Sequence, residues 1–319
     1  RNFVNGIADT SVFLSEVWEE PSAPIIASAT PADRVALEVL RASKHLIVVP
    51  LLVRYYERAT QTDTASAKSD FWSVVRAVAA FWTLWRSSRT TTSGIDGVHR
   101  ALIKTGQAST SLPALGRSST ATKDLPSVAA LQATLRDLLE RRLHITDQAS
   151  WARLVNSQQL YETSRILARY ILVCAHDDAV VDPALDGQMT RGASGCWTTL
   201  TTEIWAGHYT VEHIAPQNKN SADVSYSKEL YDEGDISRLG NLTLLPQDLN
   251  SLVGNRPWAF KRDVFRMLAE TDKDKRVAAL KQGDLYGLGA KSKALLESSD
   301  FMPFCKFVAG YKSTTFDRK

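Results

Sequence analysis

The residue types best suited to catalysis gather within residues 209–261, in three short groups. The first group contains Glu212 and His213, the second contains Asn241, and the third begins at Asn250. Histidine has a pKa near neutrality and can take a proton from water. Carboxylate and amide oxygens are the ligands that hard divalent cations prefer. These residue types are therefore suited to metal-assisted hydrolysis, with His213 as the base and with Glu212 and Asn250 as ligands of the ion.

A strand must position the first group. Residues 210–214 show the β-branched alternation of a strand, and Pro216 ends it because proline cannot donate to a β-ladder. Successive side chains of a strand point to opposite faces, so we expect Glu212 and His213 to be neighbours that face away from each other.

A second strand and a helix must position the other two groups. Gly240-Asn241 is a tight-turn dipeptide, residues 242–245 read as a short strand, and the chain turns helical from Gln247 onward. The predicted arrangement is a β-hairpin followed by a helix. A polar insert over residues 217–235 makes the hairpin connection long.

Three separated segments carry a family resemblance, in an order that chance rarely produces. They are Val211-Glu-His-Ile-Ala-Pro-Gln217, Leu239-Gly-Asn-Leu-Thr-Leu-Leu245, and Asn250-Ser-Leu-Val-Gly-Asn255 followed by Trp258 and Lys261. The set resembles the HNH, or ββα-metal, endonuclease motif. More narrowly, it is similar to the C-terminal nuclease domain of GmrSD-like modification-dependent restriction proteins, a group that includes SspE-like phage-defence nucleases.

The resemblance implies a catalytic set. It makes His213 the general base, Asn250 a catalytic residue that binds the ion together with Glu212, and Asn241 the residue that bridges the hairpin loop and orients the histidine. The implied cofactor is a divalent ion, Mg²⁺ first and Mn²⁺ as the alternative. Zinc-stabilised members carry a Cys-x-x-Cys pair where this chain has Pro246 and Leu249, so we expect no structural zinc.

Basic residues next to the motif leave alternatives open. Lys261 matches a lysine of the family and is either a phosphate contact or an exposed helical lysine, and Asn255 is either a second ligand or the N-cap of the following helix. Residues 254–282 hold eight basic and four acidic side chains, so their charge of +4 exceeds the +3 of the whole chain. This segment, with Arg256 and Arg262, is either a surface that contacts DNA phosphates or an ordinary solvated helix.

The composition limits the classes of protein to which this chain can belong. A chain of 319 residues with 44% hydrophobic and 23% charged residues can bury a core, and a net charge of +3 does not by itself argue for nucleic-acid binding. The three cysteines are far apart, which excludes a zinc ribbon and a disulfide framework. There is no apolar run of membrane-spanning length and no signal peptide, so we expect a cytoplasmic protein.

The rest of the chain predicts helices. Helical apolar spacing recurs near residues 3–17, 31–56, 69–85, 96–104, 127–144, 151–160 and 164–176, whereas the Ser, Thr, Gly and Pro of 106–127 indicate a mobile loop. We expect a mainly α protein with an all-helical domain over 1–195 and a ββα-metal nuclease domain with basic C-terminal helices over 196–319. The start at Arg1, within a helical pattern, suggests a fragment of a longer protein.

The leading hypothesis is therefore a metal-dependent DNA endonuclease that nicks its substrate, in a restriction or anti-phage defence system. The resemblance implies DNA as partner, either unmodified or modified, for example phosphorothioated or glycosylated, and a nucleotide-binding sensor upstream of this segment. One alternative is a non-cleaving, HNH-like module that binds nucleic acid under the control of that sensor. A third reading treats the helices as an oligomerisation scaffold.

Overall fold

The computed structural model describes residues 2–116, 125–182, 184, 189–192, 209–218, 224–282 and 288–317. The chain folds into two compact units, residues 1–158 and residues 159–319. The predicted domain boundary between residues 195 and 196 lies outside the described residues and stays a prediction. The predicted fold class is confirmed, because helices dominate the described residues and the strands form two small two-stranded sheets.

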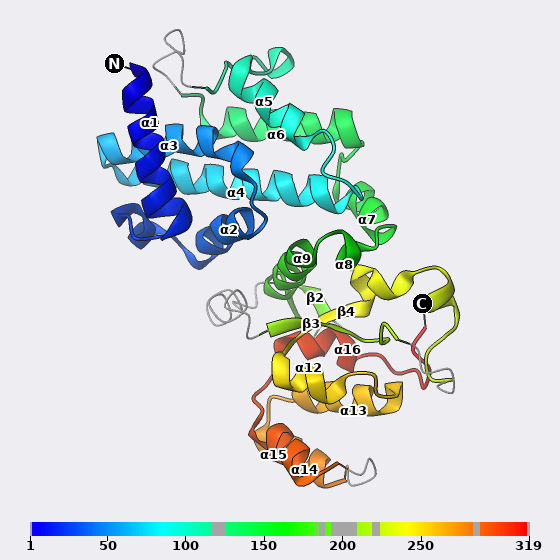
Figure 1. Cartoon of the computed structure of the whole chain (residues 1–319). Coiled ribbons are helices and arrows are strands. Elements are labelled where there is room, and N and C mark those ends of the chain that lie inside the picture. Colours follow the sequence, from blue (N-terminus) through cyan, green and yellow to red (C-terminus); the bar gives the residue numbers. More distant parts are fainter. Residues whose placement is uncertain are drawn as a thin grey trace. The chain divides into compact units, whose positions relative to one another are not determined.

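The first unit contains only helices among its described residues (Figure 1). Its elements are α1 (Asn2–Phe13), η1 (Leu14–Glu19), η2 (Pro24–Ser28), α2 (Pro31–Ala42), η3 (Leu46–Val48), α3 (Val49–Thr62), α4 (Ala65–Ser87), α5 (Ile95–Lys104), η4 (Ala108–Thr110), α6 (Val128–Leu143) and α7 (Gln148–Asn156).

Helix α4 is the centre of this unit. It packs against α2, α3 and α6, and Figure 1 shows it running between them. Its aromatic residues are buried, and Phe71 meets the ring of Phe13 edge to face with centroids 6.4 Å apart. A helix that is apolar on more than one face is one that the core surrounds. These aromatic residues are therefore part of the core of the unit.

Local signals place the helix ends. Thr30 forms a capping box with Asp33 at the start of α2, and the Ser127 hydroxyl accepts a hydrogen bond from the Ala130 amide at the start of α6. Pro50 is expected to kink or split the helix predicted over 31–56, and the segment is indeed divided: α2 ends at Ala42, and Pro50 lies in the first turn of α3. A proline in the first turn leaves no helical hydrogen bond unmade, so the chain breaks before it rather than at it.

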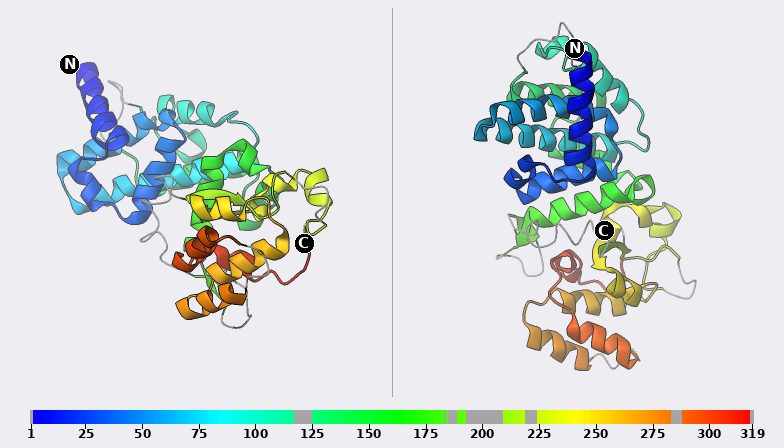
Figure 2. Two further views of the ribbon diagram at one scale, coloured as in Figure 1. Left: turned by 60° about the horizontal axis from the view of Figure 1, so that its bottom comes forward. Right: turned by 60° about the vertical axis from the view of Figure 1, so that its left-hand side comes forward.

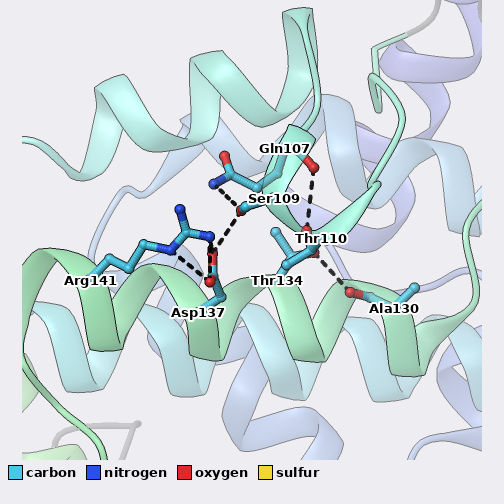
Figure 3. A network of polar contacts seen from close by, with 7 residues as sticks. All are labelled: Gln107, Ser109, Thr110, Ala130, Thr134, Asp137 and Arg141. Atoms are coloured by element: carbon cyan, nitrogen blue, oxygen red, sulfur yellow. Dashed lines mark hydrogen bonds and ion pairs between the residues drawn. The ribbon is translucent and has the colours of Figure 1, made fainter.

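The prediction of a mobile loop over 106–127 is wrong for its first part. Residues 107–112 form an ordered turn on α6, in which the Thr110 and Thr134 hydroxyls are 2.7 Å apart and Ser109 donates to Asp137 at 3.2 Å (Figure 3). Arg141 in turn holds the Asp137 carboxylate with both sides of its guanidinium. The polar residues that predicted mobility are the ones that make this network. Residues 117–124 lie outside the described part of the chain.

Two histidines are buried together in the first unit. The ring centroids of His45 and His99 are 5.1 Å apart, and neither Nε2 atom has a hydrogen-bond partner within the described residues. Burial lowers the pKa of His45 to about 4, with Asp96 opposing the shift and Arg86 adding to it. Burial, and then the neighbouring His45, lower the pKa of His99 to about 3. Both rings are therefore neutral at pH 7.

The first unit is expected to lose stability as the pH falls below about 6.5, the pKa of histidine in an unfolded chain. Below that pH the two histidines bind protons in the unfolded chain, whereas in the folded unit His45 stays unprotonated until about pH 4 and His99 until about pH 3. Acid therefore favours the unfolded state. Urea titrations followed by tryptophan fluorescence should show a free energy of unfolding about 2–4 kcal/mol lower at pH 5 than at pH 7. His99→Leu should shrink this difference, whereas His144→Asn, at an exposed helix end, should leave it unchanged. Equal free energies of unfolding at the two pH values would contradict the expectation.

The second unit combines helices with both small sheets. Its elements are α8 (Leu160–Thr163), α9 (Arg165–Asp177), β1 (Ala179–Val181), β2 (Met189–Arg191), β3 (Tyr209–His213), α11 (Glu229–Asp232), η5 (Asp235–Ser237), η6 (Leu239–Asn241), β4 (Leu242–Pro246), α12 (Gln247–Val253), α13 (Trp258–Leu268), α14 (Lys273–Gln282), α15 (Ala290–Ser298), η8 (Pro303–Cys305) and α16 (Lys306–Ala309). Helices α14 and α15 lie side by side in all views (Figures 1 and 2). No helix in the described part of the chain is long and apolar enough to cross a membrane.

Strands β3 and β4 with helix α12 form the predicted ββα arrangement. The strands are antiparallel, with Glu212 opposite Thr243 and His213 opposite Leu242. Helices α9 and α12 both pack on this sheet, and Figure 1 shows them on opposite sides of it. The sheet is therefore covered on two sides, which is why β4 is buried along nearly its whole length.

Candidate active site

Glu212 and His213 stand at the end of β3, with their side chains directed to different neighbours. The Glu212 carboxylate meets the Lys261 ammonium from α13, with Oε1 and Nζ 2.5 Å apart. The His213 ring instead meets the ring of Tyr161 from α8, with centroids 4.4 Å apart and planes at 82°. The strand alternation that predicted opposite faces thus separates the carboxylate from the imidazole.

Lys261 is not a surface residue. Its side chain is fully buried, and Nζ donates to Glu212 and to the backbone carbonyl of His213 at 2.7 Å. Both predicted alternatives for Lys261, a phosphate contact and an exposed helical lysine, are therefore wrong. The reason is the apolar spacing of α13, which puts Lys261 on the same face as the buried Trp258 and Phe265.

Burial dominates the electrostatics of this ion pair. It raises the pKa of Glu212 to about 7, although the adjacent Lys261 acts in the opposite direction. Burial likewise lowers the pKa of Lys261, and Glu212 opposes that change. A buried carboxylate and a buried ammonium each lose hydration, and their mutual contact offsets part of that cost. Each partner therefore depends on the other to stay charged inside the unit.

His213 is held as a neutral imidazole. Burial lowers the pKa of His213 to about 4; Lys261 and Arg165 add to the effect and Glu162 opposes it. The Nε2 atom is buried and has no hydrogen-bond partner within the described residues. A neutral imidazole offers one nitrogen as a proton acceptor. The arrangement can therefore present an unprotonated base at neutral pH.

Asn241 fastens the loop after β3. Its amide nitrogen donates to the carbonyls of Ala215 at 2.9 Å and Ile236 at 2.8 Å, and its amide oxygen accepts from the Ala215 amide at 2.7 Å. The backbone carbonyl of Asn241 accepts a hydrogen bond from the backbone amide of Ile214 at 2.9 Å. The side chain is buried and turned toward backbone, so its geometry is that of a brace beside His213.

Asn250 ties α12 to β3. Its amide nitrogen donates to the Thr210 hydroxyl at 2.8 Å and to the Val211 carbonyl at 3.2 Å. This fixes the orientation of the amide and directs its oxygen away from those two acceptors. Asn255 is exposed and does not cap α13, whose N-cap position is held by Pro257 without a side-chain hydrogen bond. The prediction that Asn255 is an N-cap is wrong.

The two predicted DNA-binding arginines are placed differently. Arg256 is exposed, with its guanidinium 4.9 Å from the ring centroid of Phe260. Arg262 is only 19% exposed and lies 3.4 Å from the carbonyl of Ser313 and 3.5 Å from Asp263. Arg256 is therefore open to solvent and to a polyanion, whereas Arg262 is largely engaged inside the unit.

Three residues around His213 were not predicted from the sequence. The ring of Tyr161 packs on the imidazole. The guanidinium carbon of Arg165 lies 4.8 Å from the centroid of the Tyr161 ring. The Glu162 carboxylate accepts a hydrogen bond from the Ser237 hydroxyl at 2.9 Å. They come from α8 and the start of α9, which the sequence assigned to the scaffold domain. Contacts between residues some 50 positions apart leave no local pattern to find, so no signal in the chain pointed to them.

The donor set fits a hard divalent ion in type. Glu212 offers a carboxylate and Asn250 an amide oxygen, which leaves most coordination positions to water and phosphate. No three His, Cys, Asp or Glu side chains gather at one place within the described residues. The unpartnered, buried Nε2 of His213 marks a place where a further group, such as a water, completes the hydrogen bonding.

Comparison with known families finds a match over the part of the chain that contains these residues. Residues 145–291, which include α8, α9, β3, β4 and helices α12 to α14, match the family model of GmrSD restriction endonucleases, C-terminal domain. The match covers less than half of the chain, and it is this segment that is similar to the C-terminal region of GmrSD restriction endonucleases. Restriction endonucleases act on DNA, so DNA is the substrate class that the match implies. A search of curated proteins finds no match.

Proposed function

We propose that the second unit is a metal-dependent DNA endonuclease of the HNH type that nicks its substrate. The observation that carries this proposal is His213, a buried and neutral imidazole with an unpartnered Nε2, at the end of a ββα unit within a restriction-endonuclease region. Restriction or anti-phage defence is the setting that the family favours. DNA that carries a modification, such as phosphorothioate or glucose, is the substrate to try first.

The chain's own residues have distinct tasks in the proposed hydrolysis. His213 takes a proton from a water, the water oxygen forms a bond to phosphorus, and one phosphorus–oxygen ester bond breaks, with the leaving oxygen taking a proton from solvent. Asn241 keeps the loop after His213 in place, and Lys261 holds the His213 carbonyl and the Glu212 carboxylate. These contacts fix the end of β3, and with it the direction of the imidazole.

Glu212 and Asn250 are the residues that would hold the ion. A bound Mg²⁺ or Mn²⁺ would supply electrostatic stabilisation of the negative charge that develops on the phosphate and the leaving oxygen. Glu212 is bound to Lys261, so ligation by its carboxylate requires either sharing with the ammonium or a shift of it. Asn250 already has its amide nitrogen engaged by β3, which leaves the oxygen as the donor atom toward a cation.

A supercoiled-plasmid assay tests the proposal. The purified chain with Mg²⁺ or Mn²⁺ is expected to convert supercoiled plasmid to nicked circles, and EDTA should stop the reaction. His213→Gln, which keeps a side chain against Tyr161, should slow nicking by about 100-fold or more, the contribution expected of a general base. His144→Asn, in the first unit, is the matched control and should nick at the parent rate. Equal nicking by the His213 variant and the parent would refute the assigned base.

A second candidate function is a module that binds DNA without cleaving it. The observation that favours it is the Lys261–Glu212 pair, because an ammonium already neutralises the one carboxylate of the proposed ion site. This candidate predicts DNA binding that weakens steeply with salt, together with no nicking in either ion. Gel-shift titrations at several ionic strengths, run beside the plasmid assay, separate the two functions.

A further inference from the structure

Arg165 occupies a position that is poor for stability. It is the first residue of α9, directly after the N-cap Ser164, whose hydroxyl accepts from Leu167. The first turn of a helix favours acidic side chains, because the unpaired amides and the macrodipole make that end positive. Arg165 is exposed, and it has no acidic partner within the described residues. A cation held there against the helix dipole gains nothing from an ion pair.

Tyr161 connects this exposed cation to the buried base. The Arg165 guanidinium carbon lies 4.8 Å from the centroid of the Tyr161 ring, and the same ring meets His213 with centroids 4.4 Å apart. The two separations together keep the guanidinium within about 9 Å of the imidazole. Hydrogen bonds of about 2.8 Å from a guanidinium to a phosphate oxygen, and from an imidazole to a water, allow one phosphate group to lie between the two.

The neighbouring acid, Glu162, acts electrostatically on His213 but is not paired with Arg165. Glu162 follows Tyr161 in the chain, and its carboxylate would repel a phosphate. Its Oε1 accepts from the Ser237 hydroxyl at 2.9 Å, so it is bound to η5 and does not pair with Arg165. Arg165 is thus the positive group of this corner that is left for a ligand. A guanidinium can give a phosphate two parallel hydrogen bonds.

We propose that Arg165 binds the DNA phosphate next to His213, and that Tyr161 is a positioning residue that holds the guanidinium and the imidazole in one orientation. This deepens the proposed nuclease function and rests on it. A guanidinium that stacks on a tyrosine keeps its hydrogen-bonding edge free, so the stacking and the phosphate contact are compatible. The tyrosine acts through its ring, because the ring is what both neighbours touch.

The test uses the full chain and plasmid DNA, both modified and unmodified, with two readouts. For Arg165→Gln we expect the slope of log binding constant against log salt to fall by about one, as for the loss of one phosphate contact. Nicking at saturating DNA should fall by about 10-fold or more, and Arg165→Lys should recover the salt slope. The matched control is Arg89→Gln, which removes a similar stacked arginine, 5.2 Å from the ring centroid of Trp85, in the first unit.

Tyr161 is tested by the same two readouts. Tyr161→Phe should behave as the parent, whereas Tyr161→Leu should slow nicking at saturating DNA by about 10-fold and leave the salt slope unchanged, because it removes orientation and not a phosphate contact. Thermal unfolding of each variant checks that the fold is intact.

The outcomes separate the two proposals. If the parent binds DNA but never nicks, the nuclease function fails, and the salt slope of Arg165→Gln still decides the phosphate contact. If the parent nicks, and Arg165→Gln matches Arg89→Gln in both slope and rate, the phosphate contact is refuted. Absence of DNA binding by the parent at low salt refutes both. A rate for Tyr161→Leu equal to that of the parent refutes the positioning role alone.

Discussion

Replacing Lys261 with methionine is expected to lower the free energy of unfolding of the second unit by about 3–5 kcal/mol, the range found when a buried ion pair loses one partner. Methionine keeps most of the length and packing of the lysine, so the change isolates the charge. Glu212 would then be buried with no cation beside it. Urea unfolding at pH 8, where the carboxylate is ionised in the unfolded chain, measures the loss.

A double variant shows whether the charge is the cause. Glu212→Gln combined with Lys261→Met removes both charges and should recover most of the stability lost by Lys261→Met alone. Lys228→Met is the matched control, since Lys228 pairs with Asp232 at the surface, and it should change stability by less than about 1 kcal/mol. A loss for Lys261→Met no larger than that of the control would show that the buried pair contributes little.

Asn241→Ala is expected to lower both the stability of the second unit and the rate of nicking. It leaves the Ala215 amide and the carbonyls of Ala215 and Ile236 without their partners in a buried loop. Buried groups without partners cost about 1–3 kcal/mol each, so we expect a loss of about 3 kcal/mol or more in the free energy of unfolding. Nicking should fall by about 100-fold, because a displaced loop moves the base from its working position.

Asn241→Asp sharpens this test. The carboxylate keeps the shape of the amide but cannot donate, so the two carbonyls lose their partners while the Ala215 amide keeps one. It should destabilise nearly as much as the alanine variant. Asn156→Ala, at the exposed end of α7, provides the baseline for an asparagine that braces nothing. Stability of both Asn241 variants equal to this baseline would contradict the bracing role.

Local chemistry made the helix starts and the ββα order predictable. The signals are the Thr30 and Ser127 caps, the strand alternation before Pro216 and the dipeptide Gly240-Asn241. Each of these signals depends only on residues that are close in the sequence, so it can be recognised without the structure. The polar turn over 107–112 was misjudged for the opposite reason. Its order depends on hydroxyl and carboxylate partners on α6, more than twenty residues away, such as Thr134.

The candidate site divides in the same way. Its motif residues could be found from type and spacing, but the partners of those residues could not. Lys261 was a partial exception, because Trp258, Lys261 and Phe265 follow helical spacing, and a lysine in register with two buried aromatics could have been assigned to the interior. Tyr161 and Arg165 offered no such clue, since they reach His213 only through the folding of α8 and α9 beside β3.

The contact between Lys261, Glu212 and the His213 carbonyl has a consequence for how this unit is made. Because an ammonium from α13 already balances the carboxylate, the end of β3 reaches its shape with no ion to neutralise it. Folding of this unit therefore does not depend on the binding of an ion. This contrasts with zinc-nucleated domains, which stay unfolded until their ion arrives. For the proposed nuclease, this means that a newly synthesised chain folds before a divalent ion activates the cleavage of DNA.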